Sequence, residues 1–313
     1  MSMIHQARDV TDTVRRIAIS RGPEGVRWLR DLDALVADLE RRWDLRVGRV
    51  LAGATEAFVA EARTSEGQIA VLKVAIPGRN PMLNQARTLM AAEGRGYARV
   101  FRYDEPSQAL LLERLGAQLF ELGLPIDDQI KIICRSLEQA WETPFETLDL
   151  PSGSDRARML GGLIEDLWFA LGKPCSERTI ETARRYAELR AHAFNPETSV
   201  LVHGDAHAWN TLQTLGHDSQ FKLIDPDGVV AERACDLGVS MREWRNELLV
   251  GDTLGLGRRR CALLSRITAV PPEPIWQWGL IECVSNGLLF LQEGDGEEGV
   301  ASLAIAAAWA EDA

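Results

Sequence analysis

Two short segments in the second half of the chain constrain it more than any other part of the sequence. The first, residues 201–210, reads Leu-Val-His-Gly-Asp-Ala-His-Ala-Trp-Asn, and the second, residues 222–228, reads Lys-Leu-Ile-Asp-Pro-Asp-Gly. Each begins as an apolar run and ends in polar residues, which is typical of a buried strand that leads into a loop. The sequence therefore predicts two polar loops joined by a hairpin.

Three polar residues in these loops fit the chemistry of phosphoryl transfer. Asp205 and Asn210 form a His-x-Asp-x-x-x-x-Asn pattern with the preceding histidine, and Asp225 follows the hairpin. Kinases use such a pattern, because one carboxylate orients a hydroxyl while other oxygen ligands hold Mg²⁺ against the phosphates. Asp205 is therefore the predicted catalytic residue, and Asn210 and Asp225 are the predicted magnesium ligands.

The first loop has two other interpretations. His203 and His207 invite a zinc site, but the glycine between them and the apolar residues before them favour a strand-to-loop turn, and no cysteine lies near in sequence. Alternatively, Asp205 and Asn210 serve only to satisfy backbone groups of the loop. The position of Asp225 after a second apolar run favours phosphoryl transfer over both.

The first third of the chain is predicted to be rich in strands. Residues 1–46 favour helix with a break at Pro23, and a helix over 82–93 is opened by Asn80–Pro81. Lys73 lies within an apolar run, which indicates that its amine reaches solvent, a partner or a ligand. The predicted strands cover residues 45–51, 57–62, 69–76, 97–103 and 109–112.

Beyond residue 115 the apolar residues recur at helical spacing, so we place a domain boundary there, between residues 1–115 and 116–313. This pattern predicts an α+β protein with a strand-rich N-terminal part and a helical C-terminal part. The predicted helices cover residues 117–122, 127–141, 154–171, 176–194, 237–249, 256–268, 274–293 and 296–310.

Charge and composition exclude several classes of partner. The formal net charge of -11 argues against a general nucleic-acid or anionic-membrane surface and is compatible with a cationic small molecule. Residues 1–9 lack the pattern of a signal peptide, and the apolar windows 279–291 and 299–310 are too short to span a bilayer. Five widely spaced cysteines predict reduced thiols in a cytoplasmic protein.

Together these motifs resemble the aminoglycoside phosphotransferase family of the protein-kinase-like fold, especially its streptomycin 6-kinase and hydroxyurea phosphotransferase members. The resemblance covers about residues 24–290 and is most specific in the two loops. The residues that carry it are 202–210, 223–228 and 235–237, supported by 53–55, 70–74, 94–96 and 110–115.

The resemblance implies a bilobal fold, Mg²⁺ and ATP as cofactors, and a small-molecule hydroxyl as the phosphate acceptor. Streptomycin or a related aminoglycoside is the acceptor we favour. The alternatives are a metabolite kinase acting on choline, methylthioribose or a sugar amine, and a catalytically weak nucleotide-binding module. The implied nucleotide-binding residues are Lys73, Gly53, Ala54 and Thr55, with Glu113 and Leu115 at an adenine-facing hinge; His203, Asp236 and Asp227 (in an Asx turn) support the loops.

One position departs from the family pattern. Kinase-like folds place a glutamate on the first helix of the small lobe, where it pairs with the strand lysine. The matching position here carries Gln85, whose amide can bind Lys73 but cannot neutralise it. Glu56 and Glu93 are the other candidate partners for the lysine.

Overall fold

The structure is a computed structural model that describes residues 10–78 and 82–311. The chain divides into two compact units, of which unit 1 comprises Met1–Gly94 and Ala98–Gly116, and unit 2 comprises Arg95–Tyr97 and Ala117–Ala313. The predicted helix start at Asn80–Pro81 and residues 1–9, which are predicted to lack a signal peptide, lie outside the described residues. Within the described residues, no helix has both the length and the apolar composition needed to cross a membrane.

Unit 1 contains a five-stranded sheet in the order β1-β2-β3-β5-β4, with antiparallel neighbours throughout. The predicted strand over 97–103 begins later than expected, at Val100, because Tyr97 pairs with Leu223 of unit 2 instead of joining this sheet. The strands are β1 (Leu45–Val50), β2 (Ala57–Thr64), β3 (Ile69–Ala75), β4 (Val100–Asp104) and β5 (Ala109–Glu113).

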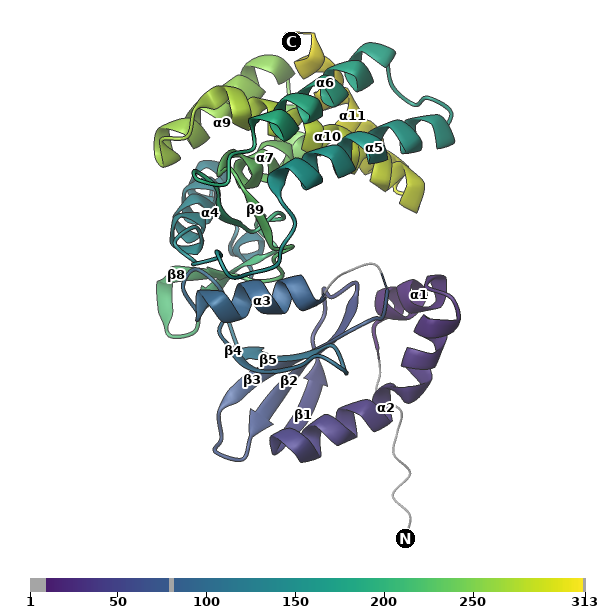
Figure 1. Cartoon of the computed structure of the whole chain (residues 1–313), viewed down its shortest axis with the longest axis vertical. Helices are drawn as coiled ribbons and strands as arrows, with labels where there is room; N and C mark the ends of the chain where they lie inside the picture. Colours follow the sequence, from purple (N-terminus) through teal and green to yellow (C-terminus); the bar gives the residue numbers. More distant parts are fainter. Residues whose placement is uncertain (1–9, 79–81, 312–313) are drawn as a thin grey trace. The chain divides into compact units, whose positions relative to one another are not determined.

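Helices cover both faces of this sheet, α1 (Asp12–Ser20) and α2 (Pro23–Trp43) on one side and α3 (Met82–Ala92) on the other (Figure 1). Apolar residues of α1 and α2 form one core cluster with alternate residues of the strands, including Leu72 and Val74 of β3. Because side chains alternate along a strand, Lys73 points to the opposite face of the sheet, the side of α3.

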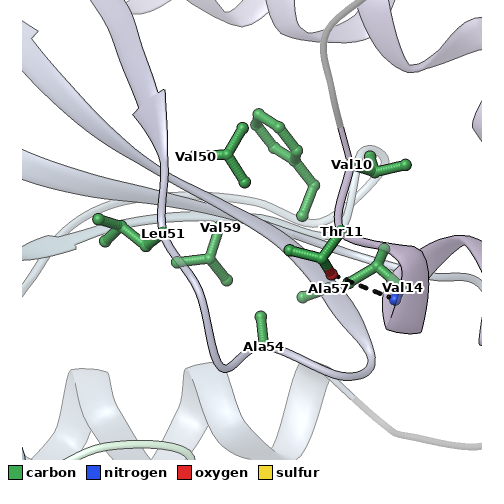
Figure 2. A pocket seen from close by; sticks show the side chains of 9 residues that line it. Val10, Thr11, Val14, Val50, Leu51, Ala54, Ala57 and Val59 are labelled. Atoms are coloured by element: carbon green, nitrogen blue, oxygen red, sulfur yellow. Dashed lines mark hydrogen bonds between the residues drawn. The ribbon is translucent and has the colours of Figure 1, made fainter.

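Helix α1 also packs against the loop between β1 and β2. Val14 of α1 and Ala54 of the loop line the same small apolar pocket, and Thr11, the N-cap of α1, lies beside them (Figure 2). At the end of the loop, directly before β2, Glu56 forms an ion pair with Arg21. The contacts with α1 and Arg21 therefore hold the loop that contains Gly53. Gly53 has a φ of 92°, a backbone conformation that glycine adopts readily and other residues rarely adopt.

Unit 2 is mainly helical, with two short strand pairs (Figure 1). Strand β6 (Val200–Val202) pairs with β9 (Val229–Ala231), and β7 (Thr211–Thr214) forms a hairpin with β8 (His217–Leu223). The helices are η1 (a 3-10 helix, Leu119–Leu122), α4 (Ile126–Ala140), α5 (Gly153–Ala170), α6 (Glu177–Ala193), α7 (Ala234–Arg242), α8 (Arg245–Leu248), α9 (Thr253–Thr268), α10 (Pro272–Glu293) and α11 (Gly296–Ala310).

The predicted helix over 237–249 is two helices. Trp244, between α7 and α8, has a φ of 51°, which a right-handed helix cannot accommodate. The guanidinium of Arg260 lies 5.4 Å from the centre of the Trp244 ring. Helical periodicity continues through this break, so the spacing of apolar residues could not reveal it.

Helix α10 is the centre of unit 2 and crosses α7 at very close range. Gly238 of α7 lies against Trp278, and Gly279 of α10 lies against Met241. A Cβ added at Gly279 would be 2.7 Å from the Cβ of Met241, closer than packed carbon atoms can approach. Two glycines, one on each helix, thus let the two backbones approach each other.

We therefore expect Gly279→Ala to lower the free energy of unfolding by about 1–3 kcal/mol, because the added methyl must push α7 away from α10. The matched control is Gly162→Ala in α5, where a new Cβ meets nothing within 4 Å. There the better helix propensity of alanine should raise stability by up to about 1 kcal/mol. Urea denaturation of both variants checks the prediction, which is wrong if the two changes have the same sign.

Candidate active site

The predicted loops lie next to each other in unit 2. The first follows β6 and the second precedes β9, and these two strands are hydrogen-bonded. The Ile224 amide donates to the Asn210 carbonyl at 2.9 Å, and the Asp227 amide donates to the His203 carbonyl at 2.8 Å. The sequence-predicted residues Asp205, Asn210 and Asp225 are therefore carried by two loops that are tied together through their backbones.

His203 supports both loops with its ring. It is fully buried, its Nε2 donates to the Ile224 carbonyl at 2.8 Å, and its Nδ1 accepts the Asp205 amide at 3.0 Å. The Tyr97 ring stacks on it with a centroid distance of 5.9 Å. Because both ring nitrogens are used within the loops, the geometry favours a supporting role over a zinc ligand.

Asp236 anchors the start of the first loop. Its carboxylate is fully buried in α7 and accepts the His203 amide at 3.0 Å, the Gly204 amide at 2.7 Å and the Trp141 indole N–H at 2.8 Å. Burial raises the pKa of Asp236, and these donors oppose that effect. Asp236 thus acts on the loop backbone, away from solvent.

Position 204 requires a glycine, both because of its backbone conformation and because no room is left for a side chain. Its φ is 89°, and an added Cβ would lie 2.9 Å from the Cβ of Asp227 and 3.1 Å from a guanidinium nitrogen of Arg156. Any side chain at this position would separate the two loops.

Asp205 has basic neighbours on both carboxylate oxygens. Oδ1 accepts from Arg242 at 2.5 Å and Oδ2 lies 3.3 Å from Nε2 of His207, while 38% of the side chain stays exposed. Partial burial alone would raise the pKa of Asp205, but His207 and Arg242 outweigh it and hold that pKa well below the usual range. Asp205 is therefore ionised at neutral pH and well placed to accept a hydrogen bond.

Asn210 and Asp225 offer oxygen ligands from the two loops. The Asn210 amide nitrogen donates to the Asp205 carbonyl at 3.0 Å, which leaves its side-chain oxygen as an acceptor. Asp225 has a φ of 60°, an uncommon conformation for a residue other than glycine that often marks functional sites. An amide oxygen and a carboxylate are the hard ligands that Mg²⁺ prefers, so the donor set fits this ion.

Three largely buried charged residues of this site were missed by sequence reasoning. Arg156 of α5 donates to Asp227 at 2.8 Å, and Arg242 of α7 binds Asp205. Between them, Glu282 of α10 lies 3.2 Å from Arg156 and 3.4 Å from Arg242. A signal was present, because Glu282 is the one charged residue in the apolar stretch 275–290.

The residues predicted to bind nucleotide belong to unit 1. Lys73 lies in β3, whereas Gln85 is buried in α3, a helix that contains no acidic residue. Of the other candidate partners for the lysine, Glu56 pairs with Arg21, and Glu93 is exposed beyond the end of α3.

Backbone groups of Glu113 and Leu115 already form hydrogen bonds. The Glu113 amide donates to the Arg99 carbonyl at 2.8 Å. The Leu115 carbonyl accepts from the guanidinium of Arg114. Two backbone groups of the predicted adenine-facing hinge, the Glu113 amide and the Leu115 carbonyl, are therefore hydrogen-bonded within unit 1.

The chain is similar to known phosphotransferases along most of its length. It is 26% identical to streptomycin 6-kinase of Streptomyces griseus over 88% of each chain. It is 28% identical to hydroxyurea phosphotransferase of Kitasatospora aureofaciens, over 88% of this chain and 77% of that protein. The choline kinase LicA of Streptococcus pneumoniae has the same fold, with a TM-score of 0.61 and 14% identity over 91% of this chain and all of that one.

These likenesses confirm the predicted kinase-like α+β fold. The model of the aminoglycoside/hydroxyurea antibiotic resistance kinase family matches residues 42–294, which is most of the chain. The chain therefore belongs to this family of kinases and is a phosphotransferase.

Proposed function

We propose that this protein transfers the γ-phosphoryl group of Mg·ATP to a hydroxyl group of an aminoglycoside such as streptomycin. The observation that carries the proposal is the pair of tied loops, which together present Asp205, Asn210 and Asp225. The names of the sequence relatives support the choice of acceptor, since two are streptomycin 6-kinases.

In the proposed mechanism Asp205 positions the acceptor hydroxyl. The pKa of Asp205 is held low, so its carboxylate is a weak base, which suits a loose transition state that needs little early proton transfer. Asp205 would accept the hydroxyl hydrogen bond, aim the oxygen at the phosphorus, and take the proton late. His207 lies beside it, and although partial burial lowers the pKa of His207, the Asp205 charge raises it overall.

The other residues would bind the nucleotide. Asn210 and Asp225 would hold Mg²⁺, which neutralises phosphate charge when bound. Lys73 would contact the α/β-phosphates, and the 53–55 loop would cover them. Because α3 contains no carboxylate to pair with Lys73, we expect the lysine to be oriented by an amide such as Gln85.

A cationic acceptor would be bound by carboxylates of unit 2, but several of these carboxylates already pair with arginines. Glu165 binds Arg184 at 2.9 Å, and Glu247 binds Arg260 at 2.5 Å. Glu243 lies 3.9 Å from Arg242, a longer and weaker pairing. Of these three carboxylates, Glu243 is the best placed to meet an amino or guanidino group near Asp205.

The decisive experiment is a phosphorylation screen with Mg·ATP, using streptomycin, other aminoglycosides, choline, methylthioribose and amino sugars. We expect mass spectrometry to detect a phosphorylated aminoglycoside and a matching amount of ADP. Transfer to choline or methylthioribose alone would make the protein a metabolite kinase. Thermal stabilisation by Mg·ATP without transfer to any acceptor would make it a nucleotide-binding module.

A further inference from the structure

A network of charged side chains, buried at its centre, connects the two candidate loops through α10. It runs from Asp205 to Arg242, on to Glu282 and Arg156, and ends at Asp227. The successive separations are 2.5, 3.4, 3.2 and 2.8 Å. Its two ends lie on different loops, and its middle lies on a helix that belongs to neither.

Along this network, the side chains become more buried toward Glu282 at its centre. The side chains of Asp205 and Asp227 are 38% and 43% exposed, those of Arg242 and Arg156 are each 10% exposed, and that of Glu282 is 3% exposed. A carboxylate so far from water is costly unless it is paired, and each arginine also needs an anion. Glu282 supplies that anion to both arginines at once.

The close crossing of α7 and α10 makes this arrangement possible. Arg242 ends α7, and Glu282 lies one helical turn after Gly279, the glycine that packs against Met241. Arg156 is additionally fixed by the Gly204 carbonyl, to which it donates at 2.7 Å. The guanidinium groups are therefore held from the protein interior and have little freedom to follow the loops.

We propose that Glu282 is a positioning residue for the phosphotransfer site, holding Asp205 through Arg242 and the Asp227 loop through Arg156. The proposal rests on the proposed role of Asp205. In this arrangement the acceptor-binding carboxylate and the loop of the metal ligand Asp225 share one buried support. Loss of the Glu282 charge should disturb both loops while leaving the nucleotide-binding residues of unit 1 unchanged.

The test compares Glu282→Gln with the parent protein. A neutral amide presents an N–H group to one of the arginines, so Arg242 and Arg156 cannot both stay in place. We expect kcat to fall about 10- to 100-fold, as for other supporting residues, and KM for Mg·ATP to rise as well, because the loop of the metal ligand Asp225 is also disturbed. Glu282→Asp keeps the charge on a shorter side chain and should recover part of the loss.

Backbone hydrogen exchange gives a second readout that does not depend on turnover. In Glu282→Gln, faster exchange should be concentrated at residues 203–210 and 224–228. The matched control is Glu232→Gln, which removes a carboxylate that binds Arg190 at 3.2 Å and the Trp278 indole at 2.9 Å, also in unit 2. This control should lower stability without changing kcat or exchange in the two loops.

The inference is overturned if Glu282→Gln keeps the kcat and loop exchange of the parent protein. It is equally overturned if exchange rises uniformly through unit 2 in both variants, because Glu282 would then only stabilise packing. If the parent protein phosphorylates no acceptor, the proposed function fails. The exchange comparison still decides whether Glu282 positions the loops.

Discussion

Replacing Asp205 with alanine is expected to lower kcat by about 10²- to 10⁴-fold, the usual contribution of a residue that positions or accepts the reacting proton. The affinity for Mg·ATP should stay close to that of the parent protein, because Asp205 is not among the residues proposed to bind the nucleotide. Single-turnover kinetics measure the first quantity, and thermal shift in the presence of Mg·ATP measures the second.

The fold should tolerate this substitution. Removing the Asp205 carboxylate leaves Arg242 with two other anions, Glu282 at 3.4 Å and Glu243 at 3.9 Å. The guanidinium is therefore not left as an isolated buried charge, which would be strongly destabilising. A loss of activity accompanied by unfolding would contradict this account of the site.

The matched control for Asp205→Ala is Asp218→Ala. Asp218 is an exposed aspartate in β8, so its loss changes the net charge equally without touching either loop. We expect this control to keep the parent kcat. If Asp205→Ala also turns over at the parent rate, the assignment of the acceptor-binding carboxylate is wrong.

A second large effect is expected from Asp236→Ala, this time on stability. The change removes the buried acceptor of three N–H groups, those of His203, Gly204 and Trp141. Each unsatisfied buried donor costs about 1–3 kcal/mol, so the free energy of unfolding should fall by roughly 3 kcal/mol or more. Guanidinium denaturation of the parent and the variant measures this difference.

An exposed aspartate that binds only one amide provides the comparison. Asp252 caps α9 by accepting the Gly255 amide at 2.9 Å at the protein surface. Asp252→Ala should cost about 1 kcal/mol, the typical value for a lost helix cap. Equal losses for the two variants would show that burial of Asp236 does not matter, contrary to our description of the loop anchor.

The sequence was most informative where chemistry and local pattern coincide. The alternation of apolar runs and polar loop residues identified β6, the hairpin of β7 and β8, and the loops that carry Asp205, Asn210 and Asp225. Helical periodicity placed most helices of unit 2 within a few residues of their observed ends. These features depend on neighbours along the chain, which a sequence displays directly.

The sequence was least informative about partners that are distant along the chain. Arg156 and Glu282 are 126 positions apart, and nothing near either residue predicts their contact at 3.2 Å. Their pairing depends on how α5, α7 and α10 pack, which small residues such as Gly279 decide. Similarly, Arg21 and Glu56 meet only because α1 folds against the sheet.

The helices α1 and α2 lie almost entirely before residue 42, where the family match begins. They nevertheless cover Phe58, Leu72 and Leu111, which belong to the sheet core. A fragment cut at the start of the match would expose that apolar face and promote aggregation. For this protein the region recognisable by similarity is thus smaller than the region needed for independent folding. A fragment made to study the matched region should therefore keep α1 and α2.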